Sequence, residues 1–342
     1  MVFFRTRTMP THPPTSPTPG TYRFVVGSAA EAVATIQARL GPTARVVSVQ
    51  AQPRPGLGRW LRAPRFVVVA ELPPPPEPAR LEPTAPTEPV APESTAGENR
   101  LAATLRRAGF SDRLLGRLEA LPGWREATEQ PLSQALAGMG REIHSSAGTR
   151  PVRPLPARAA FFGAPGAGST TALCKWLSRE VFTRAATGQV WQVQFDRPNP
   201  APALGVFCEA LGVPLEHYVP GLSVAERGFL LVDLPGLPPA GSPAITTVAR
   251  FLDREKIAGR VLVLNAAYAA ENLRAANARG RELGATHLVL THLDEVNQWG
   301  RLWEFLLEGD LSPLFLGSGP ALTGEIETEV IGAVLRRTLP GS

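Results

Sequence analysis

A glycine-rich turn between an apolar run and a segment of helical periodicity is the strongest candidate for chemistry in this sequence. Residues 163–171 read GAPGAGSTT and follow the apolar residues 159–162. Unpaired main-chain amides at the start of a helix attract phosphates, together with the helix dipole. The spacing follows the phosphate-binding pattern GxxxxGK[ST], except that Ser169 occupies the lysine position. The matching residues are Gly163, Gly168 and Thr170.

The turn after a later apolar run, residues 228–232, supplies a second part of such a site. It begins with Asp233, and Gly236 follows three residues later. Because Mg²⁺ prefers oxygen ligands, we expect the Asp233 carboxylate to lie on the side of a Mg²⁺ ion. The Gly236 amide is expected to face a γ-phosphate.

Two more turns carry residues suited to a nucleobase. Thr291 and Asp294 follow the apolar run at 287–290, and a carboxylate at Asp294 can accept hydrogen bonds from N1–H and N2–H of guanine. The same carboxylate repels N1 of adenine, which disfavours ATP. Gly317 and Ser318 form a small turn beside the base. A lone Asp after a strand is usually a helix cap, but four such turns in this order form a specific pattern.

The segments between these turns predict the scaffold that positions them. From residue 157, apolar runs alternate with helical periodicity, which indicates a parallel sheet with helices on both faces. Ligands of such sheets bind at the carboxyl ends of the strands. The predicted strands are residues 159–162, 190–195, 228–232, 261–264, 287–290 and 314–316. The predicted fold class is α/β, of the P-loop NTPase kind.

Changes in proline content divide the chain into units. The predicted units are a disordered tail at residues 1–21, a βαββ module at 22–72, a proline-rich linker at 73–98, a helical domain at 99–150 and the α/β domain at 155–340. In the βαββ module, strands are expected at residues 22–26, 44–49 and 66–72. Ser28 and Glu31 form a capping box that opens its helix.

Composition limits the cellular setting. The net charge is +5, and the positive excess comes from arginine, because Lys175 and Lys256 are the only lysines. Cys174 and Cys208, the only cysteines, are expected as buried free thiols. No apolar run approaches the roughly 20 residues that span a bilayer, and the N-terminus lacks the apolar stretch of a signal peptide. We expect a cytoplasmic protein, and nucleic acid is not favoured as a partner.

The α/β segment resembles the G domain of SRP-type GTPases over residues 157–339. Besides the glycine loop, the family motif DTAG appears as DLPG at residues 233–236, TKLDE as THLDE at 291–295, and the closing GxGE turn as GSGP at 317–320. In the glycine loop, Gly163, Gly166, Gly168, Thr170 and Thr171 match the family. The βαββ unit is similar to the flagellar (FlhF-like) branch through Glu31-Ala32 and GPTA at 41–44.

The resemblance implies GTP and Mg²⁺ as ligands. Mg²⁺ would be held by Thr170 directly and by Asp233 through water. Asp196 would position the attacking water, and Arg197 is the candidate for a catalytic arginine. The resemblance also implies flagellar or SRP-pathway protein partners, a head-to-tail G-domain homodimer and peripheral contact with the inner face of the cell membrane. The implied nucleotide-binding residues are Gly163, Gly166, Ala167, Gly168, Ser169, Thr170, Thr171, Asp233, Gly236, Thr291, Asp294, Gly317 and Ser318.

The departures from the family pattern concern catalysis. Ser169 replaces a lysine that would bridge the β- and γ-phosphates, and a charge-assisted hydrogen bond of this kind contributes about 1.5–3 kcal/mol. Asn199 and Gly205 stand where the family has an arginine and a glutamine, and an arginine at the transferring phosphoryl group contributes on the order of 10³–10⁵ in rate. His292 replaces a lysine whose stem covers the guanine ring. We therefore expect weak or lost GTP hydrolysis.

Two other functions are open from the sequence. In the first, the chain is a pseudo-GTPase scaffold that binds protein partners and no nucleotide. In the second, an arginine-rich loop between the last two strands of the βαββ module binds RNA or an anionic membrane surface. That loop carries Arg54, Arg59, Trp60, Arg62 and Arg65.

Ser169→Lys is expected to raise the affinity for GTP about ten-fold or more, because it restores a charge-assisted hydrogen bond to the phosphates. Titration with a fluorescent GTP analogue and Mg²⁺ measures the change. Ser169→Met, which adds length without charge, is the control. Unchanged affinity in the lysine variant would show that residue 169 does not lie at the phosphates.

Overall fold

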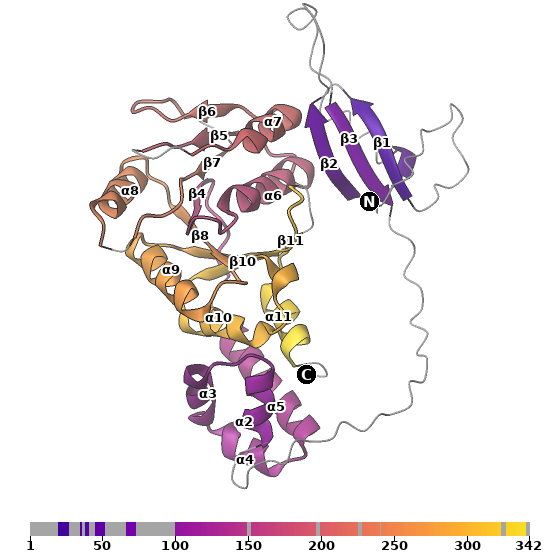
Figure 1. The fold of residues 1–342 in the computed structure, drawn as a ribbon, viewed down its shortest axis with the longest axis vertical. Helices are drawn as coiled ribbons and strands as arrows, with labels where there is room; N and C mark the ends of the chain where they lie inside the picture. The colour runs from indigo at the N-terminus through magenta and orange to yellow at the C-terminus, as the bar shows by residue number, and fades with distance from the viewer. Residues whose placement is uncertain are drawn as a thin grey trace, which may run out of the picture.

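The fold has three groups of secondary structure along the chain (Figure 1). A small antiparallel sheet comes first, a group of short helices second, and a large sheet covered by helices third. The computed structural model describes residues 20–26, 35, 38–40, 45–51, 66–72, 100–148, 152–195, 199–224, 228–239, 241–322 and 326–339. The predicted α/β fold class, with a mostly parallel sheet, is confirmed.

The N-terminal sheet consists of β1 (Gly20–Val26), β2 (Arg45–Ala51) and β3 (Phe66–Leu72) in the order β1-β3-β2, with antiparallel pairing throughout. In β1, Phe24 and Val26 are buried, whereas the side chain between them is exposed, as expected for a strand with one covered face. β1 starts two residues earlier than predicted. Most of the predicted helix and the whole arginine-rich loop lie outside the described residues.

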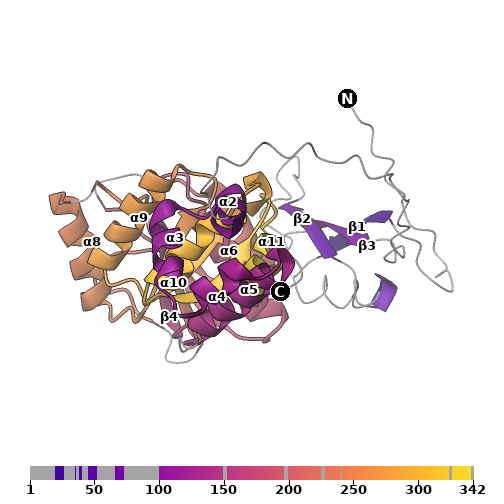
Figure 2. The same cartoon turned by 90° about the horizontal axis from the view of Figure 1, so that it is seen from below.

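Short amphipathic helices form the second group. They are α2 (Arg100–Arg107), α3 (Asp112–Glu119), α4 (Gly123–Glu129) and α5 (Leu132–Gly148). Ser111 caps α3 by accepting a hydrogen bond from the Leu114 amide at 3.3 Å. Each of the first two helices buries leucines on one face, among them Leu105, Leu114 and Leu118. Figure 2 shows these helices gathered beside α10 (Trp303–Glu308) and α11 (Val330–Thr338) of the third group.

The large sheet has eight strands in the order β11-β10-β9-β8-β4-β7-β5-β6. All neighbours are parallel except β10 and β11. The strands are β4 (Arg158–Gly163), β5 (Gly188–Gln192), β6 (Leu215–His217), β7 (Phe229–Asp233), β8 (Gly259–Asn265), β9 (His287–Thr291), β10 (Ser312–Gly317) and β11 (Ile326–Glu327). All six predicted strands are present, although β5 ends three residues before its predicted end. The edge strands β6 and β11 were not predicted, because two or three residues show no periodicity.

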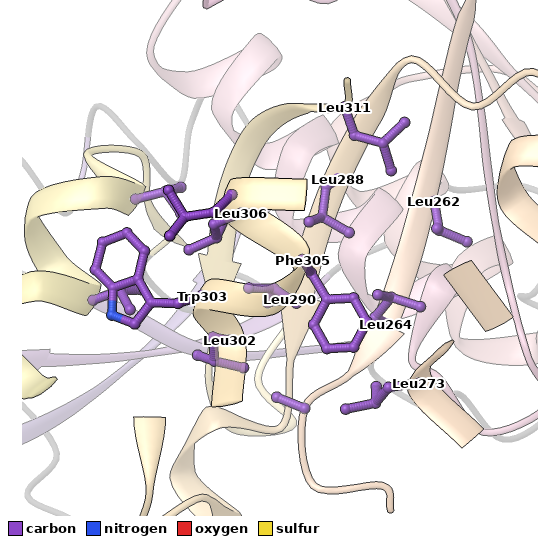
Figure 3. Close-up of a cluster of buried hydrophobic side chains, with 14 of the residues drawn as sticks. Leu262, Leu264, Leu273, Leu288, Leu290, Leu302, Trp303, Phe305, Leu306 and Leu311 are labelled. Carbon is purple, nitrogen blue, oxygen red and sulfur yellow. The ribbon is translucent and has the colours of Figure 1, made fainter. Parts of the chain in front are cut away.

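Alternation along the central strands sends side chains into two separate cores. Val261 and Val263 of β8 face the core under α6 (Ser169–Phe182) and α7 (Pro202–Leu211). Leu262 and Leu264, which alternate with these valines along β8, face the opposite core (Figure 3). That core is covered by α8 (Pro243–Arg254), α9 (Ala270–Glu282), α10 (Trp303–Glu308) and α11 (Val330–Thr338). None of the helices in the described part of the chain is long and apolar enough to cross a membrane.

The helical group and the α/β domain share one core and several polar contacts. Leucines of α2 and α3 belong to the same buried cluster as Leu302 and Trp303. The Gly300 amide donates to the Ala108 carbonyl at 2.9 Å, and the Ser111 hydroxyl donates to Glu304 at 3.2 Å. Close main-chain approach at Gly300 therefore fixes how the two groups meet.

Gly300→Ala is expected to destabilise the protein by about 1–3 kcal/mol, the usual cost of overpacking. Its added Cβ would lie 2.6 Å from Phe110 Cδ2 and 2.9 Å from the Phe110 nitrogen. Gly116→Ala in α3 is the matched control, because no atom lies within 4 Å of its added Cβ; alanine there should stabilise the helix by about 0.5–1 kcal/mol. Urea denaturation followed by circular dichroism compares the two variants, and a Gly300→Ala protein as stable as the wild type would contradict the packing.

Candidate functional site

The carboxyl ends of the parallel strands bring the predicted turns to one edge of the sheet. The turns after β4, β9 and β10 line a cavity of about 390 Å³, which is within the size range of small-molecule sites. Gly166, Gly168 and Lys175 lie on one side of it, and Thr291 and Asp294 on another. Residues that are more than a hundred positions apart in sequence thus enclose one space.

The glycine loop makes the bend that the sequence predicts. β4 ends at Gly163, where an added Cβ would lie 2.9 Å from Ala167 Cβ. Gly166 and Gly168 have φ angles of 77° and 79°, in the left-handed region that favours glycine. The chain then enters α6 at Ser169. All seven predicted loop residues, 163 and 166–171, lie on this turn and the first turn of α6, where free amides gather.

Thr291 fastens the loop to β9. Its hydroxyl donates to the Ala167 carbonyl at 2.8 Å, and the side chain is buried. His292 follows with a φ of 55°, and its Nδ1 lies 3.0 Å from the same hydroxyl. Thr291 was predicted as a nucleotide-binding residue. Its observed hydrogen bond gives it a positioning role toward the glycine loop.

At the other end of the cavity, the main chain after β10 orients Asp294. The Gly319 amide donates to Asp294 Oδ1 at 2.9 Å. This hydrogen bond is the main reason that the pKa of Asp294 is below its usual value, so the carboxylate is ionised at neutral pH. The other carboxylate oxygen is available to a ligand that donates hydrogen bonds. Ser318, between Gly317 and Gly319, is exposed beside this carboxylate.

Lys175 supports the same end of the cavity and was not predicted to take part. It lies in α6, and its ammonium group donates to the Ser318 carbonyl at 2.8 Å. Burial lowers its pKa, while the nearby Asp294 charge raises it. A lysine in the second turn of a helix that follows a glycine loop is a sequence signal that could have indicated this role.

Thr170 and Asp233, the predicted Mg²⁺ residues, are in direct contact. The Thr170 hydroxyl donates to Asp233 Oδ1 at 2.9 Å. Mg²⁺ takes oxygen ligands, so the Thr170 hydroxyl is a candidate direct ligand and the Asp233 carboxylate a candidate for contact through water.

Asn199 holds the second oxygen of Asp233. Its Nδ2 donates to Asp233 Oδ2 at 3.0 Å, and its carbonyl accepts a hydrogen bond from Gln192 at 2.7 Å. Asp233 is fully buried, and this burial raises its pKa to about 6, against the lowering effect of the two hydrogen bonds. In the sequence Asn199 indicated only a missing arginine; its contact with Asp233 is long-range and gives no local signal.

The loops after β7 and β8 lie against the glycine loop. Gly236 faces Pro165 so closely that an added Cβ would lie 2.9 Å from Pro165 Cγ. Tyr268, which sequence reasoning did not single out, donates from its hydroxyl to the Pro165 carbonyl at 3.0 Å. It lies in the turn that follows the carboxyl end of β8.

Two catalytic candidates and the two cysteines complete the set of predicted residues. Asp196 and Arg197, the candidate catalytic residues, lie outside the described part of the chain, and their roles stay predictions. Cys174 and Cys208 are buried free thiols, as predicted.

Solved structures with a similar fold identify the class of fold to which this chain belongs. No family model matches the chain, and no curated protein matches it. Among solved structures, FlhF complexed with GMPPNP and Mg²⁺ is 18% identical with a TM-score of 0.53, over 70% of this chain and 97% of that one. FtsY from Thermotoga maritima is 17% identical with a TM-score of 0.54, over 70% and 86%. Chloroplast FtsY from Physcomitrella patens is 16% identical with a TM-score of 0.58, over 71% and 90%.

These similarities show that the chain has the P-loop fold of the SRP-type GTPases. The fold that the predicted resemblance implies is confirmed, and it is shared with both FlhF and FtsY. The fold places the glycine loop, Asp233 and Asp294 at the sheet edge where ligands of doubly wound sheets bind.

Asp233→Asn is expected to stabilise the protein at pH 8 by up to about 3 kcal/mol. Burial raises the pKa of Asp233 from 3.8 to about 6, so the folded state binds this proton more tightly than the unfolded chain. The stability linked to the proton is fully present below pH 3.8 and is lost as the pH rises through about 6. The amide has no such proton to lose.

Urea denaturation in EDTA at pH 8 and at about pH 4 measures this effect, and the gain should shrink toward the lower pH. Asp310→Asn, which removes an exposed carboxylate, is the control. An Asp233→Asn protein that is less stable than the wild type at pH 8 would contradict a raised pKa of Asp233 in the folded protein.

Proposed function

We propose that the chain is a guanine-nucleotide-binding protein of the SRP-GTPase type, with weak or lost GTP hydrolysis. One observation carries the proposal: a single cavity has free helix-start amides at one end and an oriented, ionised carboxylate at the other. Amides at a helix start suit phosphates. A carboxylate accepts from the two N–H groups of guanine and repels N1 of adenine.

The residues of the site divide the binding of GTP and Mg²⁺ between them. The amides of Gly166 and of Gly168 to Thr171 would hold phosphates, and Asp294 would hold guanine; the Ala167 amide donates to the Ala164 carbonyl at 2.9 Å. Thr170 and Asp233 would hold Mg²⁺, which neutralises phosphate charge when bound. The similar fold of FlhF, solved with GMPPNP and Mg²⁺, supports these ligands.

The side chains at the phosphate end support weak or lost hydrolysis. Ser169 brings no positive charge to the start of α6. Asn199, at the position of the family's arginine, uses its side-chain amide to hold Asp233. Neither Ser169 nor Asn199 therefore supplies a positive charge that would stabilise the negative charge developing on a phosphoryl group.

For the cellular role, we propose flagellar assembly or placement, or targeting of membrane proteins, through protein partners. A homodimer of G domains and peripheral contact with the inner face of the cell membrane belong to this proposal, as does a cytoplasmic location. The fold shared with FlhF and FtsY supports it. A nucleotide-free scaffold is the second candidate, because the hydrogen bonds of Asp233 are satisfied within the protein.

Asp294→Asn is expected to exchange guanine specificity for xanthine specificity. The carboxamide accepts only one hydrogen bond from guanine and directs its NH₂ group at the guanine N2 amine, whereas xanthine has an oxygen there. Affinity for GDP should fall about ten-fold or more, by the strength of a hydrogen bond to a charged group. Calorimetric titration with GDP, XDP and ADP measures the exchange.

Glu295→Gln is the matched control, because it removes the same charge from the adjacent position of the cavity wall. Phosphate release from GTP by the wild type is measured in parallel and should be slow. Equal affinities for GDP and ADP would contradict guanine recognition. Absence of binding at millimolar nucleotide would leave the scaffold function.

A further inference from the structure

Tyr268 covers the part of the glycine loop that precedes the helix. Its hydroxyl donates to the Pro165 carbonyl at 3.0 Å. An added Cβ on Gly166 would lie 2.7 Å from the same hydroxyl oxygen. The phenol therefore lies directly against the main chain of Gly166, where a side chain on the loop would leave no space for it.

The turn that carries Tyr268 is held at both sides. Asn265 Oδ1 accepts from the Ala267 amide at 2.9 Å, and the Tyr268 amide donates to the Asn265 carbonyl at 3.1 Å. The Arg301 side chain donates to the Tyr268 carbonyl. Because Asn265 ends β8 and Arg301 lies in the 3₁₀ segment before α10, the sheet and the packed core fix where the ring lies.

Pro165 also contacts Gly236, which lies in the loop after β7. We call the region around Tyr268, Pro165 and Gly236 the corner of the site. Pro165 and Gly236 belong to the two loops that would flank a γ-phosphate. An added Cβ on Gly236 would lie 2.9 Å from Pro165 Cγ and 3.1 Å from Pro165 Cα. The two loops are therefore in close contact, with no space for a methyl group between them. Proline also has no N–H to offer to a phosphate.

The open part of the site suits a nucleotide with two phosphates better than one with three. The cavity of about 390 Å³ extends from Asp294 to Gly166 and Gly168, and its described lining includes no residue of the loop after β7. Loop amides in this motif cradle the α- and β-phosphates, while the lysine, absent here, reaches toward the γ-phosphate. The cavity and the loop amides suit two phosphates, and Ser169 stands in place of the lysine that would reach a third.

We infer that the site selects guanosine diphosphate over the triphosphate, with Tyr268 and Pro165 as the specificity-determining residues. This inference rests on the proposed guanine-nucleotide binding and names the nucleotide that the site takes. Tyr268 acts by volume: its ring and the Pro165–Gly236 contact occupy the corner into which a third phosphate would extend. A guanine nucleotide would be held mainly through its base and its first two phosphates.

Calorimetric titration of the full chain with GDP, GTP and a non-hydrolysable GTP analogue tests the inference. The wild type is expected to bind GDP at least ten-fold more tightly than either triphosphate. Tyr268→Ala should strengthen triphosphate binding about ten-fold and change GDP binding less than three-fold. Tyr268→Phe keeps the ring without the hydrogen bond, so it should keep the wild-type preference. Pro165→Gly, which opens the corner independently of the tyrosine, should act like Tyr268→Ala.

The outcomes separate this inference from the function on which it rests. Triphosphate binding by the wild type that equals or exceeds GDP binding overturns the selectivity and leaves guanine-nucleotide binding intact. Equal gains for GDP and GTP in both Tyr268→Ala and Pro165→Gly also overturn it. If neither nucleotide binds the wild type at millimolar concentration, the proposed function itself is wrong.

Discussion

The left-handed main chain at Gly166 and Gly168 is the constraint on which the site depends. These two residues turn the chain from the end of β4 into α6, and they leave the first amides of the helix unpaired. The same turn sets the direction of α6. Lys175, about 9 Å further along the helix at 1.5 Å per residue, thereby reaches the Ser318 carbonyl at the opposite end of the cavity.

Around this turn, the structure keeps the framework of a nucleotide site while its charges differ from those of the SRP-GTPase pattern. Thr291 fastens the loop, and a main-chain amide holds Asp294. At the phosphate end, however, the partners that the described residues provide for the buried Asp233 carboxylate are neutral groups from Thr170 and Asn199. Burial of a charge without a cation is costly, which is consistent with its raised pKa.

The sequence predicted the central strands and the turns that follow them, because buried parallel strands are continuous apolar runs and glycine turns have local signatures. It could not predict β6 and β11, which are too short to show a pattern. The contact of Tyr268 with Pro165 joins positions 103 residues apart, and the contact of Asn199 with Asp233 joins positions 34 apart. Such pairs depend on how loops meet after folding, so one sequence without its fold does not reveal them.

Because contacts between distant loops are not visible in a sequence, Asn199 indicates there only that the family's arginine is missing. Comparison with the family pattern states which residue type is missing, but the new side chain acquires its own partner, here the Asp233 carboxylate. Pro165 is similar: in the sequence it is one residue of a glycine-rich turn, and in the structure it is the surface against which Gly236 and Tyr268 pack.

A crystal structure of the chain grown with saturating GDP tests the central claim most directly. The account predicts guanine against the Asp294 carboxylate and two phosphates on the amides that follow Gly166. Nucleotide density at any other place, or none in this cavity, would contradict it.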